Sequence, residues 1–153
     1  MELKDSVNIP RDRGTVWRAL NDPAVLRQAI PGCEDLNRVS EETMAGAVVV
    51  KVGPIKAKFN GEVKFSEIVP LEGYLLIGEG KGGMAGFAKG HARVRLEPDG
   101  NNATILHYEV KTDVGGKIAQ LGARLLDSTA RKLARQFFDD FNAVLSSADA
   151  EKA

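Results

Sequence analysis

The sequence has few of the residues that form covalent cross-links or bind metals. Its 153 residues include one cysteine, Cys33, and two histidines, His91 and His107. A single cysteine excludes an internal disulfide, and two histidines without a nearby cysteine make a poor zinc site. We therefore expect no metal site, and we interpret Cys33 as a buried structural thiol.

Excess charge and long apolar segments are also missing. The chain carries 21 basic and 21 acidic residues, so nothing in its overall charge attracts nucleic acid or an anionic membrane. No apolar run approaches the roughly 20 residues needed to span a bilayer. The first residues, MELKDSVNIP, contain two acids and no apolar core, which predicts no signal peptide and a cytoplasmic protein.

The sequence does contain long stretches in which polar and small residues alternate. Over residues 56–65 and 88–96, polar or charged side chains alternate with Ala, Gly, Val, Leu or Phe. This period of two predicts strands with one face in solvent and one face covered. The covered face is small at Gly46, Ala57, Gly61, Ala88, Gly90 and Ala92. Because protein interiors are close-packed, we interpret the missing volume as a pocket.

The order of the predicted elements indicates an α+β domain. A strand over 3–9 precedes a short helix ending at Leu20 and a second one beginning at Pro23. Further strands are predicted at 36–39, 43–52, 55–68, 74–80, 87–96 and 104–112. Asp113 is the predicted N-cap of a helix over 114–145, about 45 Å long. We expect one domain over 1–146, with a curved antiparallel sheet of about seven strands around this helix, and a polar tail over 147–153.

Two turns predict how the strands pair. The Gly53-Pro54 turn places Gly46 opposite Gly61, so that inward residues face inward residues. The turn at 98–102 predicts the pairs Val94–Leu106, Ala92–Tyr108 and Arg93–His107. On the solvent face we expect a polar cluster of His91, Arg93, His107 and Glu109. The small inward residues then form a contiguous strip beneath the long helix.

Two patterns that could indicate catalysis or nucleotide binding have simpler interpretations. Residues 78–83 (GEGKGG) superficially resemble a phosphate-binding loop, but a strand follows them where such loops require a helix. We expect a glycine-rich hairpin near the pocket mouth. An acid–base catalyst would need inward carboxylates or histidines. Tyr108 is the polar residue of the inward set, and the facing of Glu79 is left open.

Four sequence blocks closely resemble the G-subunit family of carbon monoxide dehydrogenase, namely Ile30–Cys33, Val52–Gly61, Gly86–Gly90 and Val114–Gly122. The resemblance implies a helix-grip (START-like) fold and a non-catalytic accessory protein of an aerobic, molybdenum-containing carbon monoxide dehydrogenase. It also implies a quinone or lipid bound in a hydrophobic cavity, no intrinsic cofactor, and transient contact with the inner face of the cytoplasmic membrane. Many members carry an extra C-terminal tail proposed to reach the membrane or the partner. The sequence shows none after Ala153, so direct anchoring is not expected.

The predicted ligand-binding residues line the strip and the facing helix: Gly46, Val48, Ala57, Phe59, Gly61, Val63, Phe65, Met84, Phe87, Ala88, Gly90, Ala92, Leu106, Tyr108, Ile118, Leu121, Gly122 and Leu125. A ligand is expected to enter near residues 82–86 and 31–32. Burying roughly 300 Å² of apolar ligand surface would contribute about 7 kcal/mol before association costs. Two alternatives stay open. One is a recruitment module whose cavity is incidental, and the other is a cyclase- or dehydratase-like enzyme on the same fold.

Overall fold

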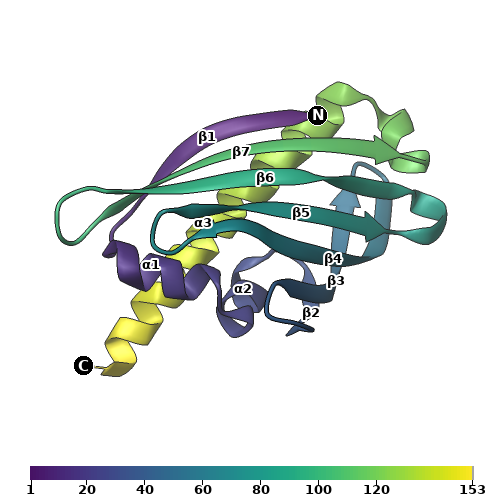
Figure 1. Cartoon of the computed structure of the whole chain (residues 1–153). Coiled ribbons are helices and arrows are strands. Elements are labelled where there is room, and N and C mark those ends of the chain that lie inside the picture. The colour runs from purple at the N-terminus through teal and green to yellow at the C-terminus, as the bar shows by residue number, and fades with distance from the viewer. Residues whose placement is uncertain (153) are drawn as a thin grey trace.

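The protein is a seven-stranded antiparallel sheet with one long helix across its inner face (Figure 1). This computed structural model describes the backbone of residues 1–152 and the side chains of residues 1–147. The elements are β1 (Glu2–Ile9), α1 (Arg13–Leu20), α2 (Pro23–Ala29), β2 (Cys33–Arg38), β3 (Thr43–Val52), β4 (Ile55–Val69), β5 (Gly73–Lys81), η1 (Gly83–Ala85), β6 (Phe87–Pro98), β7 (Thr104–Gly115), η2 (Lys117–Leu121) and α3 (Ala123–Lys152). The predicted fold class is confirmed.

The sheet has the order β1-β7-β6-β5-β4-β3-β2, so β1 and β2 are its edges. Figure 1 shows β3 running across the direction of β5, β6 and β7, which means that the sheet is strongly curved. The segment predicted as a polar tail continues the backbone of α3 to Lys152. The side chains beyond residue 147, and Ala153 itself, lie outside what the structure describes.

Local chemistry sets where the two short helices begin. Asp12 caps α1, because its carboxylate accepts a hydrogen bond from the Thr15 backbone N–H at 3.1 Å. Hydrogen bonds from Thr15 lower the pKa of this carboxyl group. Asp22 caps α2 in the same way, with Pro23 in the first turn. The two caps thus fix where α1 and α2 begin, and Leu20 of α1 and Leu26 of α2 line the cavity described below.

The predicted pairing of β3 with β4 is confirmed, with Gly46 opposite Gly61. The predicted register of β6 and β7 is wrong by two residues. The structure pairs Val94 with Tyr108, and Arg93 lies opposite Glu109 rather than His107. β6 continues to Pro98, two residues beyond its predicted end, whereas β7 begins at Thr104 as predicted. The turn therefore lies one residue further along the chain, and the Asp99 N–H donates to the Ala103 carbonyl at 2.9 Å. A two-residue shift preserves the facing of every side chain, so the inward set is unchanged.

The predicted start of the long helix is also wrong. Asp113 is not an N-cap but lies within β7, which continues to Gly115. The segment after it is a 3-10 helix, and α3 begins at Ala123. Gly116 and Gly122 adopt φ angles of 84° and 94°, a left-handed conformation that breaks an α-helix and favours glycine. The glycines therefore end the strand and delay the start of the α-helix to Ala123.

The tightly packed core occupies one end of the molecule. Its fully buried side chains include Phe141 of α3, Ile9 of β1, Val16 of α1 and Met44 of β3. Towards the other end of the sheet, the inward residues of β4 to β7 are mostly half-exposed. The long helix therefore seals only part of the concave face.

The glycines of the inward strip differ in what their missing side chains leave behind. A Cβ at Gly46 would lie 2.1 Å from the Asp35 carbonyl oxygen, and one at Gly90 would lie 2.1 Å from that of Lys111. These two glycines let neighbouring backbones approach, and our interpretation of them as unfilled volume is wrong. At Gly80, by contrast, the nearest atom would be the Phe59 Cβ at 3.8 Å. Gly80 therefore leaves real space.

Candidate functional site

An apolar cavity of about 190 Å³ lies between the sheet and the three helices. Helix residues form one side of it, and inward residues of β2 to β7 form the other. Its lining is Leu20, Leu26, Ile30, Leu36, Met44, Val63, Phe65, Tyr74, Leu76, Val94, Leu106, Tyr108, Phe137 and Phe138. This lining contains no carboxylate, histidine, lysine or arginine. The cavity is thus suited to an apolar guest.

Two tyrosines supply the polar atoms of this cavity. Tyr74 packs edge-on against Phe65, with ring centroids 5.1 Å apart, and Tyr108 lies 5.3 Å from Phe138. Burial raises the pKa of both phenols, so both are protonated at neutral pH and can donate a hydrogen bond. No side chain or backbone group among the described residues bonds either hydroxyl. A ligand oxygen within reach could therefore accept a hydrogen bond from either of them.

A second hollow of about 320 Å³ continues the apolar cavity along the concave face. Both share Val63 and Leu76 in their linings. All residues lining the second hollow belong to β4 to β7, and its inward residues include Gly78, Gly80, Ala88, Gly90 and Ala92. We call this hollow the small-residue groove. It is the place where the sheet lacks bulk and the helix does not cover it.

The structure brings together part of the predicted ligand-binding set. Val63, Phe65, Leu106 and Tyr108 line the apolar cavity, and Ala88, Gly90 and Ala92 line the small-residue groove together with Val63. The remaining predicted residues line neither hollow: Gly46, Val48, Ala57, Phe59, Gly61, Met84, Phe87, Ile118, Leu121, Gly122 and Leu125. The predicted assignment of all of these residues to ligand binding stays a prediction.

Several of the residues outside the two hollows have other neighbours. Met84 is 82% exposed in η1, and the Phe87 ring lies over Gly115. The Phe59 ring lies over Gly82, and Leu125 contacts the Gly53 turn. These residues surround the loop end of the groove, where the sequence predicted ligand entry.

Our sequence reasoning missed most of the helical side of the cavity. Leu20, Leu26 and Ile30 come from α1, α2 and the residue after α2, and Phe137 and Phe138 come from α3. The positions of these residues along their helices did not show which element they would face. Asp5 was also missed as an inward acid. It lies on the same face of β1 as Leu3 and Val7, directly opposite Tyr108. The alternation of residues along β1 could have predicted this inward position.

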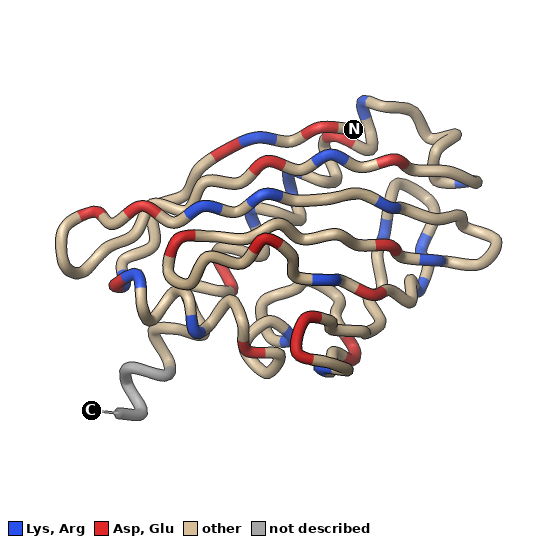
Figure 2. Tube along the Cα trace, in the orientation of Figure 1, with Lys and Arg blue, Asp and Glu red and all other residues tan. Residues whose placement is uncertain are grey.

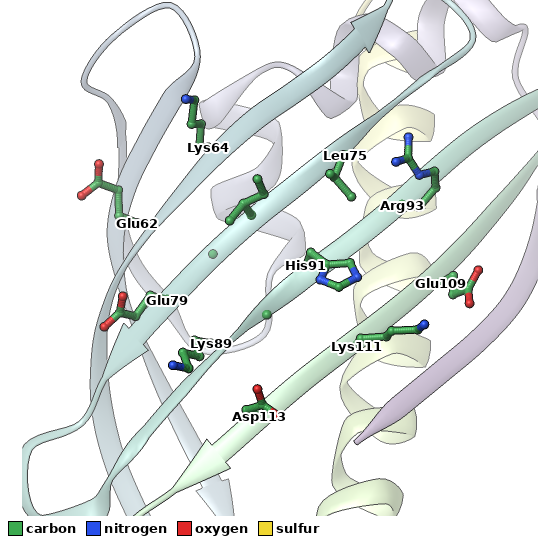
Figure 3. A pocket seen from close by; sticks show the side chains of 13 residues that line it. Glu62, Lys64, Leu75, Glu79, Lys89, His91, Arg93, Glu109, Lys111 and Asp113 are labelled. Atoms are coloured by element: carbon green, nitrogen blue, oxygen red, sulfur yellow. The ribbon is translucent and has the colours of Figure 1, made fainter.

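The opposite face of the sheet carries the charged residues and a shallow hollow of about 780 Å³ (Figure 3). Figure 3 shows Lys89, His91, Arg93 and Lys111 rising from β6 and β7 on the side away from α3. Basic and acidic residues are interspersed over the sheet (Figure 2). Although this hollow is larger than the apolar cavity, charged side chains surround it, so it does not resemble an apolar ligand site.

Several polar side chains considered in the sequence analysis lie near oppositely charged residues on this outer face of the sheet. Glu79 points outward, and its carboxylate lies 3.6 Å from the Lys81 ammonium group. Arg93 lies opposite Glu109 in the register but bonds Glu67 at 3.1 Å. His107 lies 3.6 Å from Glu97. Two members of the predicted cluster, Arg93 and His107, therefore pair with residues outside it.

Neither a metal site nor a membrane span is found within the described residues. No group of three His, Cys, Asp or Glu side chains in the described part of the chain is placed to hold a metal ion. Cys33 is half-buried, and its burial raises the pKa of the thiol. No described helix is both long and apolar enough to cross a bilayer.

Comparison with known proteins agrees with this architecture. The family model for CoxG, the G-subunit of carbon monoxide dehydrogenase, matches residues 6–146. The chain belongs to this CoxG family. The family name associates its members with that dehydrogenase, as the four sequence blocks had suggested. Among curated proteins, none is similar enough in sequence to count as a match.

Solved structures extend the fold assignment of this CoxG-family chain. A conserved protein from Geobacillus kaustophilus is 27% identical, with a TM-score of 0.91 and 97% of each chain covered. A START superfamily protein from Mycobacterium smegmatis has 10% identity and a TM-score of 0.74, over 96% of this chain and 98% of that one. The ZhuI aromatase/cyclase from Streptomyces sp. R1128 has 11% identity and a TM-score of 0.66, over 95% and 93%. The last two show the START-like fold alone.

Proposed function

We propose that this CoxG-family protein binds a quinone in the cavity between the sheet and the helices, and thereby serves a carbon monoxide dehydrogenase or a related molybdenum enzyme. The observation that carries the proposal is an apolar cavity whose two tyrosine hydroxyls lack partners among the described residues. A quinone has carbonyl oxygens that can accept such hydrogen bonds and an apolar tail that needs to be shielded from water. The small-residue groove next to the cavity offers room for that tail.

The cavity is better suited to holding a ligand than to transforming it. Acid–base catalysis requires a group that exchanges protons near neutral pH within reach of the ligand. The raised pKa values of Tyr74 and Tyr108 keep both phenols protonated. No carboxylate lines the apolar cavity, and the inward acid of β1, Asp5, is exposed at the edge of the sheet. We therefore propose a non-catalytic role.

Quenching of tryptophan fluorescence tests this function directly. The single tryptophan, Trp17, has its ring centroid 5.7 Å from that of Tyr74, which lines the cavity. A short-chain naphthoquinone should quench Trp17 saturably at micromolar concentrations, because a ligand that occupies the cavity lies beside Tyr74 and hence close to the indole. Ala92→Leu should weaken binding at least tenfold by filling the small-residue groove.

A matched control separates groove filling from a general effect on β6. Arg95→Leu places the same side chain on the outward face of the same strand, where it should leave quinone affinity unchanged. Circular dichroism checks that both variants are folded. Absence of saturable quenching in the wild-type protein, or equal losses in the two variants, would contradict the proposed function.

The outer face of the sheet favours a second candidate function, recruitment of the dehydrogenase. Ile77 is 47% exposed there, beside Leu75 and among charged residues of both signs. An apolar centre with a charged rim is the composition of many protein interfaces. Ile77→Asp should reduce co-purification of the dehydrogenase severalfold while leaving quinone binding intact. If Ala92→Leu also abolishes co-purification, the outer face is not an independent docking surface.

A further inference from the structure

A polar pocket of about 290 Å³ adjoins the apolar cavity at the edge of the sheet. It lies between β1 and α3 and is lined by Leu3, Asp5, Ser6, Val7, Tyr108, Arg131, Arg135, Phe138 and Asp139. Tyr108 and Phe138 line both spaces, so their side chains form the boundary between them. We call this pocket the vestibule. Since β1 is an edge strand, the vestibule is reached without separating paired strands.

Two arginines of α3 face this vestibule without a protein partner. Arg131 and Arg135 are one helical turn apart, and like charges at this spacing destabilise a helix by a few tenths of a kcal/mol. Within residues 1–147, neither guanidinium group forms a hydrogen bond or an ion pair within 4.0 Å. Asp5 and Asp139 line the same pocket but do not pair with them. The vestibule thus contains two guanidinium groups and the Tyr108 hydroxyl, which can all donate hydrogen bonds to a ligand.

The charges of the vestibule indicate which kind of head group it would accept. Two arginines and two aspartates give it a formal charge of zero. A full anion would gain from the arginines but would be repelled by the aspartates, whereas a neutral carbonyl oxygen could use the donors without that cost. Asp5, Arg131 and Tyr108 line this pocket together. Burial raises the pKa of Tyr108, the charge of Asp5 raises it further, and the charge of Arg131 lowers it.

We propose that the vestibule is the head-group subsite, where Arg131, Arg135 and the Tyr108 hydroxyl donate hydrogen bonds to a carbonyl oxygen of an uncharged ring. The apolar tail then passes between Tyr108 and Phe138 into the cavity. This inference rests on the proposed ligand-binding function and adds to it the orientation and the head-group chemistry of the ligand. In this arrangement the head group is bound between β1 and α3.

The test compares two probes on the full chain. The first is a naphthoquinone with a short isoprenoid chain, and the second is an isoprenoid hydrocarbon of matched length without a carbonyl group. Arg131→Gln combined with Arg135→Gln should weaken quinone binding about tenfold and leave hydrocarbon binding unchanged, since only the quinone uses the donors. Lys132→Gln, an exposed residue of the same helix outside the vestibule lining, is the matched control and should have no effect.

The possible failures have different meanings. Equal weakening of both probes would show that the arginines support the fold, and would overturn the inference. Unchanged quinone binding in the arginine variant, together with lost binding in Ala92→Leu, would also overturn it while keeping the proposed function. A chain-matched carboxylate that binds more tightly than the quinone would contradict the uncharged head. If the wild-type protein binds neither quinone nor hydrocarbon, the proposed function itself is wrong.

Discussion

Replacing Phe141 by alanine is expected to lower the free energy of unfolding by about 3–5 kcal/mol. Phe141 is fully buried, and its ring stacks on Phe137 at a centroid distance of 5.7 Å. It lies in the tightly packed end of the molecule and lines neither the cavity nor the vestibule, so its removal creates a new void in the core. Urea unfolding followed by circular dichroism measures the loss.

Phe138→Ala is the matched control for this variant. Phe138 is half-buried three residues earlier on α3, and its ring lines space that already exists. The surrounding structure therefore loses fewer contacts, and we expect about half the destabilisation or less. Quinone affinity, in contrast, should fall in Phe138→Ala. A loss of stability in Phe138→Ala as large as in Phe141→Ala would contradict the placement of the cavity.

Gly90→Ala is expected to destabilise the protein by about 3 kcal/mol, although the substitution adds only one methyl group. The added Cβ would lie 2.1 Å from the Lys111 carbonyl oxygen and 2.9 Å from the Thr112 Cα, both in the backbone of β7. Backbone atoms cannot turn aside as a flexible side chain can, so the β6–β7 pairing must shift. Thermal unfolding monitored by circular dichroism should show a clearly lowered Tm.

Gly80→Ala, one strand away, is the corresponding control. Its Cβ would meet no atom closer than 3.8 Å, and alanine loses less backbone entropy than glycine on folding. We expect this variant to be neutral or slightly stabilised. Equal destabilisation by the two substitutions would show that glycine at Gly90 is not required by the close approach of β7.

The Gly90→Ala and Gly80→Ala pair separates two functions of small residues in the sheet. Gly46 and Gly90 allow strands to bend and approach each other, whereas Gly80 and Ala92 leave volume above the sheet. Small residues therefore allow close strand packing at some positions of the concave face and leave unfilled volume at others. Both effects are needed for a groove, since a flat or fully filled sheet would pack against the long helix without a cavity.

The binding site could be predicted from the sequence only on its sheet side. The period of two placed Val63, Tyr108 and Ala92 on the inner face, and a register error of two residues did not disturb that result. The helical side was missed, because a helix pattern shows which residues are apolar but not where the helix crosses the sheet. Phe137, Phe138 and Arg131 enter the site only through the docking of α3.

The sequence by itself determined the seven strands, the two short helices, the order of these elements, the antiparallel sheet and the family. These follow from local periodicity, turn residues and recognisable blocks. Only the tertiary structure decided which small residues leave space and which face a neighbouring backbone. It also decided that Asp5, Tyr108 and Arg131, from three distant segments, meet at one edge of the sheet. Local patterns fix the facing of each residue, whereas contacts between segments depend on strand curvature and helix docking, which no single segment encodes.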